Sequence, residues 1–156
     1  MNIGILVYSQ TGNTLSVAEK LKAALESKGH DACIESITNE GEISPGKPVT
    51  LVSVPDPAKY DALVFAAPVM AFSLNPVMKE YLQQIPPIKG KKAGVFSTQQ
   101  FPANWMGGNR AMKTMSVLLS AKGAQAFRGG VVHWKDEKKR SAQAEEVIAA
   151  LCKAFS

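Results

Sequence analysis

The sequence predicts an α/β protein with a doubly wound parallel sheet of five strands and helices on both of its faces. Apolar, strand-like runs alternate along the whole chain with amphipathic, helix-like runs. Such alternation calls for parallel strands joined by right-handed helical crossovers. The chain has 156 residues, 46% of them apolar, and no repeat or linker divides it. We therefore expect a single domain over residues 1–156, with a full hydrophobic core.

The first part of the chain reads as strand, helix and strand. Residues 3–8 form an apolar run typical of a strand buried on both faces. Residues 13–28 predict a helix that ends at Gly29, because apolar residues recur there at helical spacing. These residues are Leu15, Ala18, Leu21 and Leu25. Residues 32–37 predict a second strand, in which the polar Glu35 indicates the edge of the sheet.

The middle of the chain contains the least regular segment. Residues 38–59 are rich in Gly, Pro and Ser, and residues 49–54 could form a short extra strand within them. Residues 61–67 predict a third strand that breaks at Pro68, since proline lacks the backbone N–H that a strand uses for pairing. A helix over residues 76–84 should follow and stop at two consecutive prolines.

The last third completes the alternation. Residues 92–97 predict the fourth strand, and a long loop follows over residues 98–108. A helix is expected over residues 109–121. Residues 124–134 contain the fifth strand, interrupted by two consecutive glycines, and residues 142–155 predict the final helix.

The most informative motif lies between the first strand and the first helix. It consists of Ser9, Gln10, Thr11, Gly12, Asn13 and Thr14. A loop that opens a helix presents backbone N–H groups without intrahelical partners, and the helix dipole adds positive charge there. Three hydroxyls add donors for a tetrahedral anion, and Gly12 permits close backbone approach. The loop therefore predicts a phosphate site. The alternative is that its hydroxyl side chains only cap the helix.

The loop differs from two other phosphate-binding motifs. It has no lysine, so it does not match the GxxxxGK[ST] loop of nucleoside triphosphatases. Gly12 is its only glycine, so it does not match the GxGxxG dinucleotide motif either. What remains is a neutral, hydroxyl-rich loop suited to a terminal phosphomonoester.

The loop from Ser9 to Thr14, directly after a buried strand, resembles the [ST]-x-T-G-x-T phosphate loop of flavodoxins and their relatives. The resemblance implies flavin mononucleotide (FMN) as cofactor. It also implies the flavodoxin-like strand order 2-1-3-4-5, with the flavin at the switch point between strands 1 and 3. The loops after strands 3 and 4 would then flank the isoalloxazine ring.

The resemblance assigns ring-binding candidates to both of these loops. The third-strand loop contributes Pro68, Val69, Met70, Ala71 and Phe72. Met70 and Phe72 compete for the ring contact, and the alternative for Phe72 is a place in the core beneath the following helix. The fourth-strand region contributes Ser97, Thr98, Gln99, Phe101, Trp105 and Gly107. Ser97, Thr98 and Gln99 could bond the polar edge of the ring. Phe101 or Trp105 would stack on it, although the tyrosine usual in this loop of flavodoxins is absent.

The charge of the chain departs from the acidic character of flavodoxins. Lys and Arg number 18 against 13 Asp and Glu, a net charge of +5. Part of the excess lies in residues 89–92 and 135–140, which are either solvated lysines or a docking surface for an acidic partner. Neither ring loop contains an acidic residue, so we expect the fully reduced, anionic flavin to be less destabilised than in a typical flavodoxin.

Other classes of protein find little support in the sequence. The two cysteines, Cys33 and Cys152, form no close pair and predict buried thiols rather than a metal site or a disulfide. His30 and His133 have no catalytic partner implied by sequence. No nucleic-acid motif, secretion signal or membrane-spanning run is present, so we expect a cytoplasmic protein.

The leading functional prediction is an FMN-binding, flavodoxin-type protein that carries electrons between redox partners with acidic docking surfaces. The alternative is an FMN-dependent NAD(P)H:quinone or flavin reductase on the same fold. A third possibility is a flavin-free binding module, because fold alone does not establish function.

Overall fold

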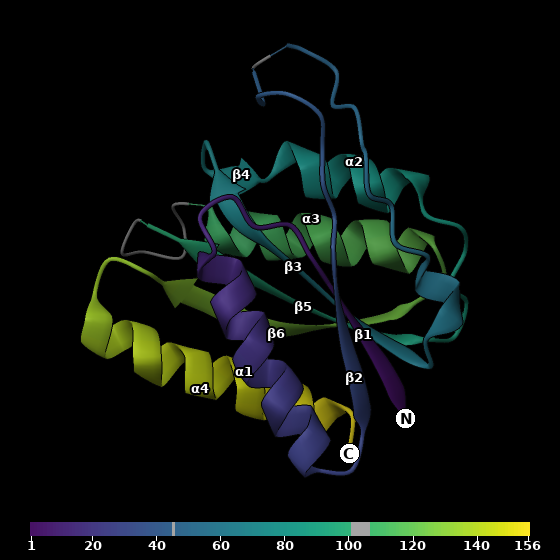
Figure 1. Ribbon diagram of the computed structural model, residues 1–156, viewed down its shortest axis with the longest axis vertical. Coiled ribbons are helices and arrows are strands. Elements are labelled where there is room, and N and C mark those ends of the chain that lie inside the picture. The colour runs from purple at the N-terminus through teal and green to yellow at the C-terminus, as the bar shows by residue number, and fades with distance from the viewer. Residues whose placement is uncertain (45, 101–106) are drawn as a thin grey trace.

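The computed structural model describes residues 1–44, 46–100 and 107–156. Figure 1 shows a twisted sheet with helices on both faces. The elements in chain order are β1 (Asn2–Val7), α1 (Asn13–Ser27), β2 (Asp31–Ser36), η1 (Pro57–Lys59), β3 (Ala62–Met70), β4 (Ser73–Leu74), α2 (Pro76–Gln84), β5 (Lys92–Gln99), α3 (Gly108–Ala121), β6 (Gln125–His133) and α4 (Glu137–Ala154). Within the described residues, no helix combines the length and apolarity needed to cross a bilayer.

The sheet confirms the predicted topology. Its path is β2-β1-β3-β5-β6, and every neighbouring pair on this path is parallel. The two-residue strand β4 lies off the path and pairs antiparallel with the end of β3. When β4 is set aside, the five parallel strands have the expected order 2-1-3-4-5.

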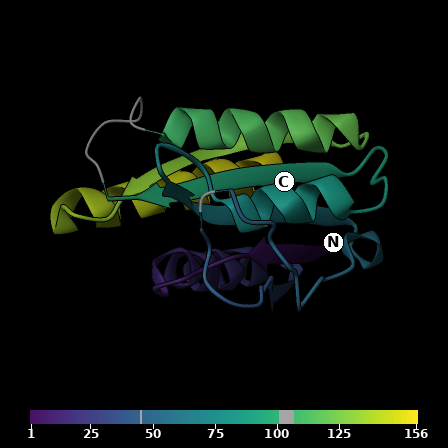
Figure 2. The same cartoon turned by 90° about the horizontal axis from the view of Figure 1, so that it is seen from above.

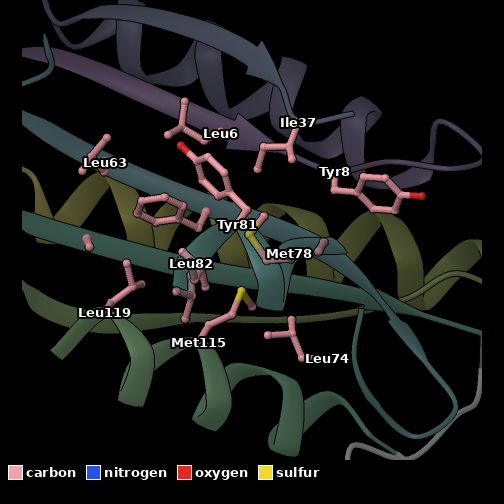
Figure 3. Packing of buried hydrophobic residues seen from close by; sticks show 14 of the residues in the cluster. Leu6, Tyr8, Ile37, Leu63, Leu74, Met78, Tyr81, Leu82, Met115 and Leu119 are labelled. Carbon is pink, nitrogen blue, oxygen red and sulfur yellow. The ribbon is translucent and has the colours of Figure 1, made fainter. Parts of the chain in front are cut away.

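Two hydrophobic cores form, one on each face of the sheet. Helices α1 and α4 cover one face through Leu21, Leu25, Val147 and Leu151. Helices α2 and α3 cover the other, and Figure 2 shows α3 and α1 on opposite sides of the sheet. Figure 3 shows this second core, where Leu6 and Leu63 from the strands meet side chains of both helices. The helix residues labelled there are Met78, Tyr81 and Leu82 from α2 and Met115 and Leu119 from α3.

Several sequence-based predictions of the elements were wrong, among them the end of β5, which continues to Gln99 rather than stopping at residue 97. Strand β3 does not break at Pro68 but continues to Met70, because it turns there into the hairpin with β4. Residues 49–54 form no strand, and only an isolated bridge joins Asn39 to Leu51. Helix α4 begins five residues early, at Glu137 rather than at residue 142. Asp136 caps it, with its carboxylate accepting hydrogen bonds from two backbone N–H groups.

The fifth parallel strand is bulged rather than interrupted. Between Val95 and Phe96 of β5, the register on β6 jumps from Arg128 to Gly130, which leaves Gly129 as the extra residue of a bulge. A Cβ at Gly129 would lie 2.9 Å from the Leu151 side chain. The glycine therefore lets α4 pack closely on the sheet while the strand continues.

The cysteines divide between surface and core. Cys152 is buried, as predicted, and burial raises the pKa of its thiol. Cys33 is exposed, contrary to the prediction, because β2 is the edge strand and one of its faces is open to solvent.

Candidate functional site

The loops after β1, β3 and β5 meet at the carboxyl ends of the parallel strands, where open α/β sheets bind their ligands. In Figure 1 these strand ends lie at the upper left, and both termini lie toward the opposite side. A cavity of about 150 Å³ opens between the loops. Its described lining comprises Ser9, Gln10, Thr11, Asn13, Thr14, Pro68, Val69, Thr98, Gln99, Gln100 and Trp134. Nine of these residues belong to the predicted cofactor-binding set.

Gly12 shapes the loop between β1 and α1. It is the N-cap residue of α1 and has φ 89°, a left-handed conformation that favours glycine. A Cβ there would find no heavy atom within 4 Å, so the space above it is open. Because the N-cap is a glycine, no side chain caps the helix from that position. The Ser9 hydroxyl instead accepts hydrogen bonds from the N–H groups of Gly12, at 3.1 Å, and Leu15, at 3.4 Å.

Thr14 connects this loop to the end of β5. Its side chain is 1% exposed, and its Oγ1 lies 2.8 Å from Oγ1 of Thr98. Next to Thr98, the Ser97 hydroxyl donates to the Ala67 carbonyl at 2.7 Å. The Ser97 side chain is therefore engaged with β3 and does not line the cavity. Thr14 and Thr98 together place a hydroxyl pair at the switch point between β1 and β3.

The β3–β4 hairpin carries a strained two-residue turn. Ala71 has φ 49° and Phe72 has φ 61°. Two positive φ values in succession are typical of a type I′ hairpin turn, which ordinarily uses Asn and Gly. The Phe72 side chain is 52% exposed, so it does not fill the core beneath α2. Met70 is half-buried, and neither it nor Phe72 lines the cavity.

Gly107 brings the two predicted ring loops together. Its φ is 124°, and a Cβ built on it would lie 2.5 Å from Cγ1 of Val69 and 2.8 Å from Cα of Phe72. Any larger residue would push the hairpin away. Gly107 therefore acts by allowing this close approach. The two predicted stacking residues, Phe101 and Trp105, lie outside the described residues.

Two cavity residues were missed by the sequence analysis. Gln100 follows β5, and Trp134 follows β6 with its N–H donating to the Gln99 carbonyl at 2.8 Å. The guanidinium of Arg140 stacks on the Trp134 ring at 4.8 Å, and its Nη1 donates to the Trp134 carbonyl at 3.2 Å. Trp134 could have been predicted from the topology, because the residue that follows the fifth parallel strand lies at the same edge of the sheet as the phosphate loop.

The cavity is electrically neutral. None of its described lining residues is Asp, Glu, Lys or Arg. Tyr8, which precedes the loop, has its pKa raised by burial, while a hydrogen bond with Gln10 acts in the opposite direction. The site therefore offers hydroxyl, amide and backbone groups with no acidic side chain among its described lining, a combination that suits an anionic ligand.

Comparisons with known proteins agree with this architecture. No protein-family model and no curated protein sequence matches the chain. Among solved structures, oxidised flavodoxin 1 from Bacillus cereus aligns over all of both chains with 17% identity and a TM-score of 0.70. The two-electron reduced flavodoxin from Megasphaera elsdenii covers 97% of this chain and 98% of its own, with 22% identity and a TM-score of 0.67.

A longer redox protein contains a similar unit. Rubredoxin oxygen:oxidoreductase from Desulfovibrio gigas matches 98% of this chain with 36% of its own length, at 14% identity and a TM-score of 0.62. Because these sequence identities are only 14–22%, the matches are evidence for the fold alone. The strand order, the two helical layers and these whole-chain alignments together show that the chain has the flavodoxin-like fold.

Proposed function

We propose that the protein binds FMN and acts as a flavodoxin-type electron carrier. The observation that carries the proposal is the conformation of the loop from Ser9 to Thr14. Its N-cap is a glycine, so neither Thr11 nor Thr14 caps α1. The Thr14 hydroxyl pairs with that of Thr98 and keeps further hydrogen-bonding capacity, so both threonine hydroxyls can bond a ligand. They lie beside the first N–H groups of α1, which have no intrahelical acceptors.

The donor set fits the phosphate end of FMN. Neutral hydroxyl and backbone donors at a helix N-terminus bind a phosphomonoester well, because the helix dipole favours negative charge there. The 150 Å³ cavity is smaller than the roughly 300–1,000 Å³ of typical cofactor pockets, so it accounts for the phosphate end alone. The ring would extend past Val69 toward the hairpin that carries Met70 and Phe72.

FMN titration of loop variants tests the proposal. Each lost hydrogen bond to the charged phosphate costs about 1.5–3 kcal/mol. We therefore expect Thr11→Ala and Thr14→Val each to raise the dissociation constant roughly 10- to 100-fold, measured by the quenching of flavin fluorescence. The exposed Thr50→Ala serves as the matched control and should leave the affinity unchanged.

The variants Thr11→Ala and Thr14→Val differ in how they are expected to affect the stability of the fold. Thr14 is buried against Thr98, so Thr14→Val can also lower stability, which a thermal melt would reveal. Thr11 is exposed, so its replacement should leave the fold intact. Unchanged FMN affinity in Thr11→Ala and in a folded Thr14→Val would refute the phosphate assignment.

The flavin would supply the redox chemistry, while the chain supplies binding, orientation and electrostatics. A carrier exchanges electrons rapidly with a reductase and does not turn over NADPH with a quinone. Steady-state oxidation of NADPH by the purified protein, with a quinone present, would instead favour the reductase on the same fold.

We also propose that an acidic redox partner docks beside the site. The first basic run, residues 89–92, lies at the opposite edge of the sheet from the site. Two of its lysines are engaged within the protein: Lys91 donates to the Ala58 carbonyl at 2.7 Å, and Lys92 donates to the Ala154 carbonyl at 3.0 Å. The other run places exposed Lys135, Lys138 and Lys139 at the ligand-binding edge. Electron transfer to an acidic partner should therefore slow as ionic strength rises.

A further inference from the structure

A second cavity, of about 340 Å³, adjoins the phosphate cavity. Its described lining consists of Gln100, His133, Lys135, Asp136 and Lys139. Gln100 lines both cavities, so they are neighbours at the carboxyl edge of the sheet. Figure 1 shows β6 leading into the start of α4 at this edge.

His133 is buried in this cavity wall with its ring unsatisfied. The residue is 7% exposed, and neither ring nitrogen has a hydrogen-bond partner among the described residues. Its backbone is fixed, because it pairs in register with Gln99 and its N–H donates to Oε1 of Gln143 at 2.8 Å. Buried polar groups in folded proteins are nearly always hydrogen-bonded, so an unpaired imidazole held this firmly points to a ligand.

The charges around His133 favour an anion. Lys135 and Lys139 are exposed at the cavity rim, and neither forms an ion pair within the described part of the chain. Asp136 is the one acidic lining residue among those described. Its Oδ1 accepts hydrogen bonds from the backbone N–H groups of Lys138, at 3.0 Å, and Lys139, at 3.2 Å. The described lining therefore carries two lysines and an imidazole against one carboxylate, whose Oδ1 is already hydrogen-bonded.

We propose that His133, Lys135 and Lys139 bind the oxyanion group, phosphate or carboxylate, of a small molecule at a site separate from the Ser9–Thr14 loop. The imidazole would donate one hydrogen bond, and the two lysines would supply charge. A molecule held in this way would lie beside the proposed flavin crevice. The site does not depend on FMN, since none of its three binding groups belongs to the phosphate loop.

Histidine NMR offers a direct test, because the chain has two histidines. Nδ1 of His30 lies 3.2 Å from the N-terminal amine, so His30 reports on a distant part of the protein. Inorganic phosphate, and separately acetate, would be titrated at fixed pH and ionic strength into flavin-free and FMN-saturated protein. We expect a saturable shift of the His133 imidazole resonances in both samples while those of His30 stay unchanged. Tighter binding of phosphate would indicate a phosphorylated ligand, and tighter binding of acetate a carboxylate.

Lysine variants test whether Lys135 and Lys139 supply the positive charge that binds the anion. The double variant Lys135→Ala/Lys139→Ala should raise the dissociation constant from the His133 shift by about tenfold. Lys138→Ala is the matched control, since Lys138 is exposed on the same helical turn but does not line the cavity. No saturable shift of His133 with either anion, or equal effects of the double variant and the control, would overturn the proposal. If FMN fails to bind, the flavin-free titration still decides this site.

Discussion

At the scale of single residues, the candidate site depends on backbone conformations that its sequence only partly favours. Gly12 and Gly107 adopt positive φ where glycine is the natural choice. Ala71 and Phe72 adopt positive φ without that freedom. Strain of this kind persists only where surrounding structure holds it, and here the hairpin is braced against Gly107. The turn therefore stores conformational energy next to the proposed ring site.

Relief of this strain should stabilise the protein. Ala71→Gly removes the steric cost of a left-handed alanine, about 1–2 kcal/mol, and adds a smaller entropic cost in the unfolded chain. We expect the free energy of unfolding, from urea denaturation, to rise by about 0.5–1 kcal/mol. The control Ala149→Gly lies on the exposed face of helix α4 and should lower it by about 1 kcal/mol. A loss of stability in Ala71→Gly would show that the turn is not strained.

At the scale of the elements, two buried tyrosines form hydrogen bonds between the irregular segment, residues 38–61, and its neighbours in the sheet and helix α2. The Tyr81 hydroxyl of α2 donates to the Pro55 carbonyl at 2.6 Å. The Tyr60 hydroxyl donates a hydrogen bond to the carboxylate of Glu35 in β2. Burial raises the pKa of both phenols well above the ordinary value, and the charge of Glu35 raises both further.

These shifts predict a loss of stability at alkaline pH. Above about pH 10 the unfolded chain loses its phenolic protons while the folded protein keeps them, so the free energy of unfolding falls as pH rises. Below pH 10 both states are protonated and the contribution is fully present. Urea denaturation between pH 8 and 11 measures the slope. Tyr81→Phe should make it shallower, and an identical slope in that variant would contradict the assignment.

Sequence patterns located elements well where local signals agree. Helix α2 has the predicted bounds because Asn75 caps it, Pro76 occupies its first turn and prolines follow its end. The start of α4 was missed because its first turn is charged and lacks apolar periodicity, although Asp136 is a recognisable cap. The extension of β3 beyond Pro68 depends on pairing with β4, a tertiary contact that local propensity does not encode.

At the scale of the whole molecule, the doubly wound topology brings distant segments to one edge. The Ser9–Thr14 loop was predictable because one contiguous motif carries it. Trp134 and His133 were not assigned to a site, because each became relevant only when β6 ended beside β5. The contact of Gly107 with the hairpin likewise joins residues more than thirty positions apart in the sequence.

The charge distribution predicts the redox behaviour of the bound flavin. No acidic residue is among the described lining of the phosphate cavity, and the neighbouring cavity carries two lysines against the single carboxylate of Asp136 among its described lining. Coulomb repulsion of the anionic, fully reduced flavin should therefore be weak. We expect the second reduction step at a higher potential than in flavodoxins with acidic side chains around the ring. A spectroelectrochemical titration measures it, and a strongly negative second step would contradict the prediction.

The affinities of FMN and riboflavin, compared by flavin fluorescence, test most directly whether the Ser9–Thr14 loop holds a phosphate. Riboflavin has the same ring and ribityl chain but lacks the phosphate. If hydroxyls and helix N–H groups bind that phosphate, FMN should bind at least about 100-fold more tightly than riboflavin. Equal affinities, or no binding of FMN, would contradict the phosphate assignment on which the proposed function rests.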